Sequence, residues 1–376
     1  MYENQDNTFI TMNKKKLLGI EFCRGLSTYA VILVHSGDET WGLPTNPSAI
    51  EFRLHFYFAV PFFLAAAFYF MTAKPGIAYS SKFWRARVER ILIPYAIWSV
   101  IFLVSRVIIF TLTNKSDRMQ QLLQDPLSIV FFGGASYHLY FLTLLFAGTS
   151  LVLLIPFLER LKISNYGLLL LSVLSIALYH FIEASDNSFQ LGTNVAFQSL
   201  LSYLRINAEQ HPLLRLILVE VAWIIRCLPY FFVALTLNRL LQKVKLLHTK
   251  FATFLLAILF LCSNMFGSFF LPGALQSLLI AYAMLLFSIS LSRYFGENTV
   301  DSLVTSVGAC SFGIYLIHPF VLNTVKYLVC KVLPELTNSI SIPSMLALSI
   351  PCFLISWVVV AYFTRNKLTA KYLFGI

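Results

Sequence analysis

The sequence predicts an all-α membrane protein, a bundle of about ten transmembrane helices with both termini in the cytoplasm. Of the 376 residues, 58% are hydrophobic and only 12% are charged, whereas about 25% of the residues of an ordinary globular chain are charged. The mean hydropathy of +0.75 agrees with this class. Runs of about 20 apolar residues recur along the chain without the alternation typical of strands, which favours a helical bundle over a β-barrel.

Ten apolar runs are long enough to cross a bilayer as helices. They cover residues 17–36, 53–73, 91–112, 137–157, 166–185, 213–237, 251–268, 270–292, 303–325 and 343–363. The seventh and eighth runs are joined by little more than residues 269–273, which predicts a tight connection. The longest connections are 113–136 and 186–212, and the second is polar enough to be a loop or a short surface helix. Residues 17–363 are therefore predicted to form one membrane domain between tails 1–16 and 364–376.

Basic residues gather in every second connection. The segments 14–16, 74–90, 160–162, 239–250, 293 and 365–371 hold 18 of the 28 Lys and Arg residues, and the alternate connections hold six. The positive-inside rule places the basic segments and both termini in the cytoplasm. Topology and anionic lipid headgroups then account for the net charge of +11, and a nucleic-acid partner is not expected.

The first run is predicted to be retained as a span, because Glu21 and Arg24 interrupt it and no small-residue cleavage pattern follows. The six cysteines lie in or at the ends of runs without a close CxxC pair, which favours packing over redox chemistry. No two histidines stand at i,i+4 spacing and no His/Cys/carboxylate cluster occurs along the chain, so no metal site is predicted.

The first run carries two ionisable residues on one helix face. Arg24 and His35 are eleven positions apart, and about 100° per residue returns the second to within about 20° of the first, about 16 Å further along the axis. A charge within hydrocarbon must be paired, hydrated or used. The predicted topology directs Arg24 toward the cytoplasm and His35 toward the outer surface. The alternative is that Arg24 pairs with Glu21 one turn earlier and that His35 only caps the span.

The segment that holds this pair is similar to a signature of the acyltransferase-3 family of bacterial integral-membrane acyltransferases, in the standalone form without an appended esterase-like domain. Further segments resemble that family in order and position, so the similarity covers nearly the whole chain. The segments are RGLSTYAVILVHS (24–36), AVPFFLAAAFYF (59–70), KFWRARVERILIPY (82–95), YHLYFL (137–142), RCLPYFFVAL (226–235) and SFGIYLIHPFVL (311–322). Ala66 and Ala67 stand where the family often has Ser-Gly, and Tyr140 stands where it usually has Trp, which leaves the shape of the acceptor pocket open.

The resemblance implies transfer of an acyl group, commonly acetyl, from cytoplasmic acyl-CoA to a hydroxyl of an extracytoplasmic or exported carbohydrate. That acceptor would be a polysaccharide, an exopolysaccharide or a lipid-linked glycan, and the location would be the bacterial cytoplasmic membrane. Acyl-CoA is then a substrate, and no permanently bound cofactor is expected. Machinery for polysaccharide synthesis or export would be a partner, beside the lipid bilayer.

The residue chemistry suits such a transfer. A neutral imidazole at His35 can act as general base on the acceptor hydroxyl as it attacks the thioester. Arg24 can contact the donor, and Arg24, a tyrosine hydroxyl or a backbone N–H can stabilise the oxyanion. Arg85, Arg87 and Arg90 stand where the third run meets the cytoplasm, and Arg87 and Arg90 at i,i+3 can bind the phosphates of CoA. The alternative for these three arginines is an ordinary topology cluster.

Other polar residues lie inside the runs or at their ends. His318 precedes Pro319, so a locally distorted backbone can turn its ring into a cavity; the alternative is a buried histidine bonded to a neighbouring helix. His138 faces the predicted outer side and can contact the acceptor. Arg106 and Arg215 are interpreted as snorkelling or interfacial residues. The candidates for acceptor contact or support are His318, Tyr315, His138, Tyr140, Glu220 and Arg226.

Two other functions stay open on the sequence alone. A transporter or flippase for a glycan or lipid-linked sugar predicts repeats and paired broken helices. A non-catalytic membrane subunit of a polysaccharide synthesis complex would use Arg24 and His35 only as structural contacts. Cleavage of acyl-CoA that depends on His35 separates the enzyme from both.

Overall fold

The structure is a computed structural model that describes residues 17–37, 45–73, 76–185, 195–207, 210–241, 249–295, 299–337 and 339–376. These residues form helices and their connections, with one β-bridge that joins Thr45 to Ile340. The all-α prediction is thereby confirmed. The predicted tail 1–16, the stretch 186–194 of the polar connection and the basic residues at 242–248 lie outside the described residues.

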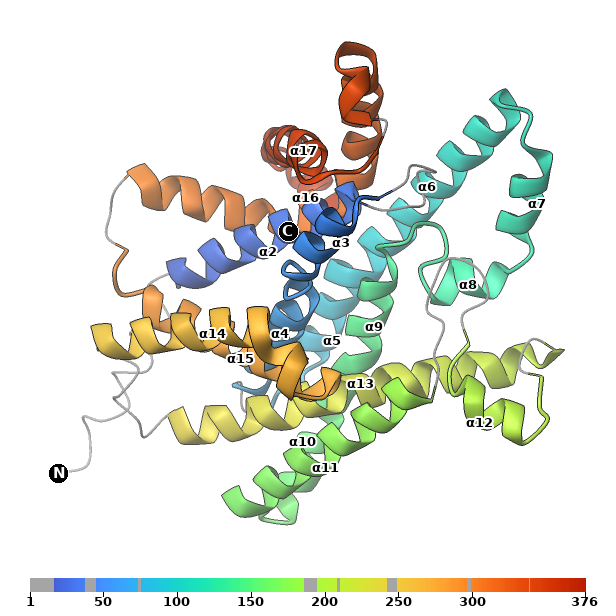
Figure 1. The fold of residues 1–376 in the computed structure, drawn as a ribbon. Helices are drawn as coiled ribbons and strands as arrows, with labels where there is room; N and C mark the ends of the chain where they lie inside the picture. The colour runs from blue at the N-terminus through green and yellow to red at the C-terminus, as the bar shows by residue number, and fades with distance from the viewer. Residues whose placement is uncertain are drawn as a thin grey trace.

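The helices are named as in Figure 1. The first half of the chain forms α2 (Leu18–Ser36), α3 (Pro47–Leu54), α4 (Ala59–Thr72), η2 (Ile77–Tyr79), α5 (Ser81–Arg87), η3 (Val88–Leu92), α6 (Ile93–Leu112), α7 (Ser116–Leu123), α8 (Pro126–Phe131), α9 (Tyr140–Thr149), η4 (Ser150–Leu153), α10 (Leu154–Arg160) and α11 (Asn165–Ala184). The second half forms α12 (Gln198–Tyr203), α13 (Pro212–Leu241), α14 (Lys250–Phe270), α15 (Gly273–Leu291), α16 (Thr299–Val332), η7 (Pro334–Thr337), α17 (Ile342–Phe363) and α18 (Lys367–Phe374).

Within the described residues, nine helical segments are long and apolar enough to cross a membrane. They correspond to the second to tenth predicted runs, and the protein is a multi-pass membrane protein. Their bounds are Pro47–Thr72, Ser81–Leu112, Tyr140–Arg160, Asn165–Ala184, Pro212–Leu240, Lys250–Phe270, Gly273–Leu291, Val300–Val332 and Ile342–Phe363. The first predicted run forms α2, a 19-residue helix that is not among the nine.

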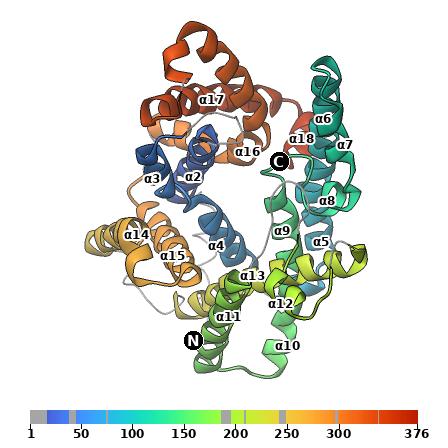
Figure 2. The same cartoon turned by 45° about the vertical axis from the view of Figure 1, so that its right-hand side comes forward.

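Helix α2 lies inside the bundle, where it packs against α16, α17, α15 and α4 (Figures 1 and 2). Glycines permit this close approach. A Cβ on Gly19 would lie 2.1 Å from the carbonyl oxygen of Ser288, and one on Gly25 would lie 2.7 Å from Val307. Small residues let helices meet backbone to backbone in a membrane protein. The helix that carries Arg24 and His35 is therefore shielded from lipid over most of its surface.

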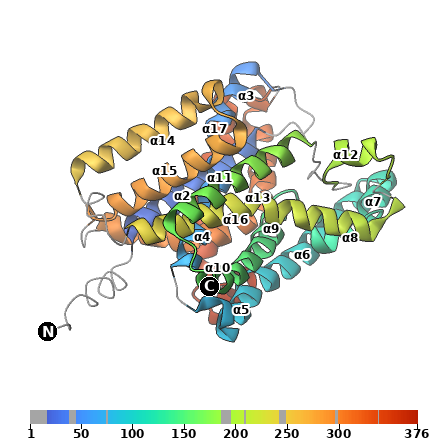
Figure 3. The ribbon, with the colours of Figure 1, turned by 90° about the horizontal axis from the view of Figure 1, so that it is seen from below.

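Two helix pairs complete one side of the bundle. Helix α11 packs along α13, and α14 packs along α15, as Figure 3 shows from below. Only Leu271 and Pro272 separate α14 from α15. The tight connection predicted between the seventh and eighth runs is confirmed.

The third span begins with α5, continues through the π-helical turn η3 and becomes α6. The C-terminal helix α18 packs against this base. The indole Nε1 of Trp98 donates to the carbonyl of Leu373 over 2.8 Å. Glu89 pairs with both Arg85 (3.0 Å) and Lys371 (3.6 Å). The chain's last helix is thus tied to the segment that carries the basic cluster.

Some predicted boundaries shift in ways that matter for the site. The fourth run was predicted to begin at residue 137, but its helix begins at Tyr140, so Tyr137 and His138 lie in the turns before α9. The ninth run extends to a 34-residue helix with Pro319 inside it. The connection 113–136 holds α7 and α8, and the polar connection ends in the short helix α12, as predicted.

Candidate active site

Arg24 and His35 lie near opposite ends of α2, so the structure does not bring them together. Arg24 donates from Nη1 to both carboxylate oxygens of Glu21, over 3.3 and 3.2 Å. This ion pair is the alternative given above, in which pairing with Glu21 explains an arginine within an apolar helix and no catalytic role is needed. The other guanidinium nitrogens of Arg24 make no hydrogen bond within the described part of the chain, and its side chain is 32% exposed. Arg24 can therefore still bind an anion beside its pair with Glu21.

His35 belongs to a group of three rings, called here the histidine cluster (His35, His138 and His318). The ring centroid of His318 is 5.6 Å from that of His35 and 5.1 Å from that of His138. The three residues come from the last turn of α2, the turn before α9 and the middle of α16. The sequence analysis treated them as separate candidates, and the fold unites them. Among the described residues, no three His, Cys, Asp or Glu side chains are placed to hold a metal ion.

The backbone of α16 orients His318. Pro319 has no N–H, so the carbonyl of Tyr315, four residues earlier, lacks its helical partner. The Nδ1 of His318 donates to that carbonyl over 2.6 Å. The neutral ring then carries its lone pair on Nε2, which is buried without a hydrogen-bond partner among the described residues. The bond lies within α16 rather than to a neighbouring helix, so it leaves an imidazole acceptor inside the cluster.

His138 is held from two directions. Its Nδ1 lies 3.1 Å from the hydroxyl of Ser136, and its Nε2 is buried and has no partner in the described residues. The hydroxyl of Tyr315 donates to the backbone carbonyl of His138. The ring of Phe102, from α6, packs edge-on against the imidazole at 5.2 Å. Tyr315 therefore joins the turn to α16, a supporting role that fits its place among the candidates.

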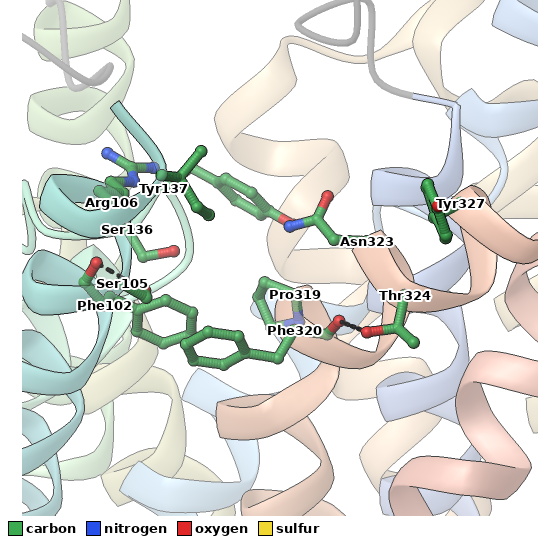
Figure 4. A pocket seen from close by; sticks show the side chains of 11 residues that line it. Phe102, Ser105, Arg106, Ser136, Tyr137, Pro319, Phe320, Asn323, Thr324 and Tyr327 are labelled. Atoms are coloured by element: carbon green, nitrogen blue, oxygen red, sulfur yellow. Dashed lines mark hydrogen bonds between the residues drawn. The ribbon is translucent and has the colours of Figure 1, made fainter. Parts of the chain in front are cut away.

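A cavity of about 400 Å³ is lined by residues that adjoin or contact the histidine cluster, and its lining side chains are drawn in Figure 4. Tyr137 forms part of its wall, and the centroid of the Tyr137 ring is 4.3 Å from that of His35. Pro319, next to His318, forms another part. The lining residues are Phe102, Ser105, Arg106, Ile109, Ser136, Tyr137, Pro319, Phe320, Asn323, Thr324 and Tyr327. The cavity thus lies between the C-terminal halves of α6 and α16, within one tyrosine ring of His35.

The basic cluster lies at the base of the third span, at the other end of α6 from the cavity. Arg85 is 80% exposed and pairs with Glu89, while the guanidinium of Arg87 lies 5.1 Å from the centroid of the Phe83 ring. Arg90 is exposed. The α-helical face assumed for Arg87 and Arg90 is replaced by a π-helical turn that starts between them. Their charges remain close enough to interact, so the two can bind one polyanion.

Tyr140 and Arg226 belong to a second group of polar side chains, separate from the histidine cluster. Arg226, on α13, lies close to Tyr140 and Tyr179, and its Nε is buried without a partner in the described residues. Tyr140 also lies close to Tyr315. Glu220, on the same helix as Arg226, makes no ion pair within the described part of the chain. Pairing of Glu220 with an arginine is thus not observed there.

The structure gives specific surroundings to the two arginines that were interpreted as snorkelling or interfacial. Arg215 is buried, and its Nη2 donates to Oδ1 of Asp125 over 2.5 Å. Arg106 lines the cavity. The partner of Arg215 lies 90 positions away, and the cavity forms only when α6 meets α16, so local sequence could not reveal either contact. The signal available for Arg106 was the one applied to Arg24, a charge inside an apolar span.

Tyr137 and Asn323 are further residues that the sequence analysis did not select. Tyr137 was noted only as a neighbour of His138, and Asn323 is one of several polar residues near the end of a span. Both residues become candidates for substrate contact because they line the same cavity, which no spacing of residues in the sequence predicts.

Comparison with known protein families shows which family the chain matches. The sequence profile of a family described as an acyltransferase domain, the third of that name, matches residues 17–361. Neither a curated protein nor a solved structure gives a significant match.

Proposed function

The chain belongs to the acyltransferase-3 family, and from this premise we propose that it transfers an acyl group from acyl-CoA to a hydroxyl of a carbohydrate on the opposite side of the membrane. The observation that carries the proposal is the histidine cluster beside a cavity. None of the three imidazoles lines the cavity itself, but Tyr137, which does, contacts the ring of His35, and general-base catalysis requires an imidazole within reach of the hydroxyl that it deprotonates. Acetyl is the acyl group expected from the family resemblance.

His35 is proposed as the general base. Its ring contacts Tyr137, a wall residue of the cavity, so an acceptor that displaces or slides past Tyr137 reaches the imidazole. His35 takes the hydroxyl proton as the oxygen attacks the thioester carbonyl carbon. The tetrahedral intermediate then collapses as the C–S bond breaks, and the imidazolium returns a proton to the CoA thiolate. His318 stacks beside His35, and His138 packs against His318, so the two rings are proposed to keep the base in place.

The donor is proposed to enter from the end of the bundle that carries Arg85, Arg87 and Arg90. CoA carries several phosphates, and guanidinium groups bind phosphate through charge-assisted, often bidentate hydrogen bonds. Arg24 lies on the path from that end toward His35 along α2. Since Glu21 engages only its Nη1, the remaining donors of Arg24 can contact the pantetheine carbonyls or the thioester.

The test uses the purified protein in lipid nanodiscs with labelled acetyl-CoA and candidate glycans. Wild-type protein should release CoA only when an acceptor is present, and His35→Ala should lower kcat by about 100-fold or more, the usual contribution of a general base. His180→Ala is the matched control, because His180 is exposed on α11, outside the cluster. Glycan binding or flux without thioester cleavage, or wild-type rates in His35→Ala, would instead favour a transporter, a flippase or a non-catalytic subunit.

A further inference from the structure

The cavity beside the histidine cluster holds a guanidinium group that the proposed transfer does not use. We infer that this cavity selects an acceptor with a negative charge close to the acylated hydroxyl, and that Arg106 binds that charge. The inference rests on the proposed function, because it concerns the acceptor of the same reaction. The charge is a carboxylate of an acidic sugar or a phosphate of a lipid-linked glycan, since both present oxygens to a guanidinium in the same way.

Arg106 differs from the other arginines buried within the spans. Arg24 pairs with Glu21, and Arg215 pairs with Asp125. Arg226 is enclosed by tyrosines. Arg106 is half-buried in the second half of α6 and has neither a carboxylate nor a hydrogen-bond acceptor among the described residues. An unpaired charge at membrane depth is costly and marks a functional site by default, so a ligand anion is the missing partner.

The surroundings of Arg106 suit one sugar unit. Phe102 and Phe320 stack at 4.5 Å with an interplanar angle of 11° and form an apolar wall, and aromatic surfaces of this kind pack against the apolar faces of sugar rings. The side chain of Asn323 points across the cavity toward Tyr137 (Figure 4). A volume of about 400 Å³ lies toward the lower end of the roughly 300–1,000 Å³ of small-molecule sites.

Polar groups of the wall are not equivalent as ligands. The hydroxyls of Ser105 and Thr324 donate to the carbonyls of Phe102 and Phe320 within their own helices, over 2.9 and 3.0 Å. Asn323 makes no such bond in the described chain. The amide of Asn323, the hydroxyl of Tyr327 and the guanidinium of Arg106 thus keep unused hydrogen-bonding capacity within the described chain, and Arg106 and Asn323 can provide donors for an anion and for a neighbouring hydroxyl.

The position of Arg106 relative to His35 determines how far the acceptor's anionic group can lie from the hydroxyl that reacts. Arg106 and Tyr137 line the same cavity, and the Tyr137 ring contacts His35. One tyrosine therefore separates the anion site from the base. The anion and the reacting hydroxyl then belong to the same sugar unit or to directly linked units.

The inference is tested with three acceptors of equal chain length in the nanodisc assay. The first is a neutral oligosaccharide, the second carries a hexuronate at the end that is acylated, and the third is the neutral oligosaccharide on a polyprenyl diphosphate. Wild-type protein should use the second or the third with a KM at least about tenfold lower than the first, the scale of a charge-assisted hydrogen bond. Preference for the second identifies a carboxylate, and preference for the third identifies a phosphate.

Arg106→Gln should abolish this preference by raising KM for the anionic acceptor, with kcat and the KM for acetyl-CoA nearly unchanged. Arg106→Lys keeps the charge and should retain most of the preference, and Arg118→Gln, an exposed arginine of α7, should change nothing. Equal use of all three acceptors by wild-type protein, or an undiminished preference in Arg106→Gln, overturns the inference and leaves the acyltransferase proposal intact. Failure to acylate any acceptor would contradict that proposal instead.

Discussion

His318 donates from Nδ1 to the backbone carbonyl of Tyr315 over 2.6 Å, and this bond is available because Pro319 leaves that carbonyl without its helical partner. A helix interruption thereby selects one imidazole tautomer. The same residue, Tyr315, donates through its hydroxyl to the backbone of His138. Two of the three rings in the histidine cluster thus depend on one turn of α16.

Replacement of Pro319 by alanine restores an N–H that competes with His318 for the carbonyl of Tyr315. We expect kcat to fall about tenfold, because the imidazole loses the bond that orients it, while the helix itself becomes more stable. Pro229→Ala, within α13, is the matched control and should leave kcat unchanged. In the His318→Ala background, Pro319→Ala should have little further effect, because coupled residues are not additive. Full additivity of the two substitutions would show that Pro319 acts only as a wall of the cavity.

The basic cluster at the base of the third span should determine the affinity for the donor. Arg87→Gln and Arg90→Gln are each expected to raise the KM for acetyl-CoA about tenfold, because each removes charge-assisted bonds to phosphate. Arg85→Gln serves as the control, since Arg85 is 80% exposed and already pairs with Glu89, and its effect should be small. Steady-state kinetics at saturating acceptor measure all three. A larger effect of Arg85→Gln than of the other two would place the phosphates elsewhere.

Apolar run length predicted the helices well, because lipid demands about 20 apolar residues per span whatever the tertiary structure. The same logic singled out His35, His138 and His318, but it could not unite them, since their contacts join segments up to 283 positions apart. The i,i+3 spacing of Glu21 and Arg24 did predict their ion pair. The sequence could not reveal that Arg106 lines a cavity, because a snorkelling arginine and a cavity arginine look identical in one helix and the cavity forms only where α16 approaches α6.

The ion pair between Asp125 and Arg215 should make stability depend on pH. Burial alone would raise the pKa of Asp125, but hydrogen bonds from Arg215 and Ser128 outweigh it and hold the pKa below its usual value. Asp125 therefore binds a proton more readily in the unfolded chain than in the folded protein. The pair stabilises the fold above about pH 4, the usual pKa of an aspartate. This stabilisation is lost as the pH falls toward the lower pKa of Asp125 in the folded protein. Asp125→Asn should cost about 3 kcal/mol at pH 7, because it leaves Arg215 buried and unpaired.

Thermal unfolding of wild type and Asp125→Asn from pH 7 to pH 3 measures this dependence. The Tm difference between the two proteins should be largest near neutral pH and should narrow below pH 4. Asp117→Asn, in α7 outside the ion pairs of the described chain, should track wild type throughout. A Tm difference that does not change with pH would mean that Asp125 contributes through shape rather than charge.

The contact between Gly308 of α16 and Glu21 of α2 should control whether the histidine cluster assembles. A Cβ on Gly308 would lie 2.3 Å from Oε2 of Glu21 and 2.7 Å from its Cα, and a backbone atom cannot move aside as a flexible side chain can. Gly308→Ala must therefore push α2 away from α16, which carry His35 and His318 respectively. We expect a loss of about 1–3 kcal/mol in stability. The fall in kcat should be larger than the fall in the fraction of folded protein at the assay temperature, which thermal unfolding measures. Gly167→Ala is the control: its Cβ would lie 2.8 Å from Cγ2 of Ile163 and would meet no backbone atom of another helix, so only a local side-chain shift is needed and the variant should stay fully active. Wild-type activity in Gly308→Ala would mean that the cluster tolerates displacement of α2, and His35 would then need only the cavity, not His318, to act as the base.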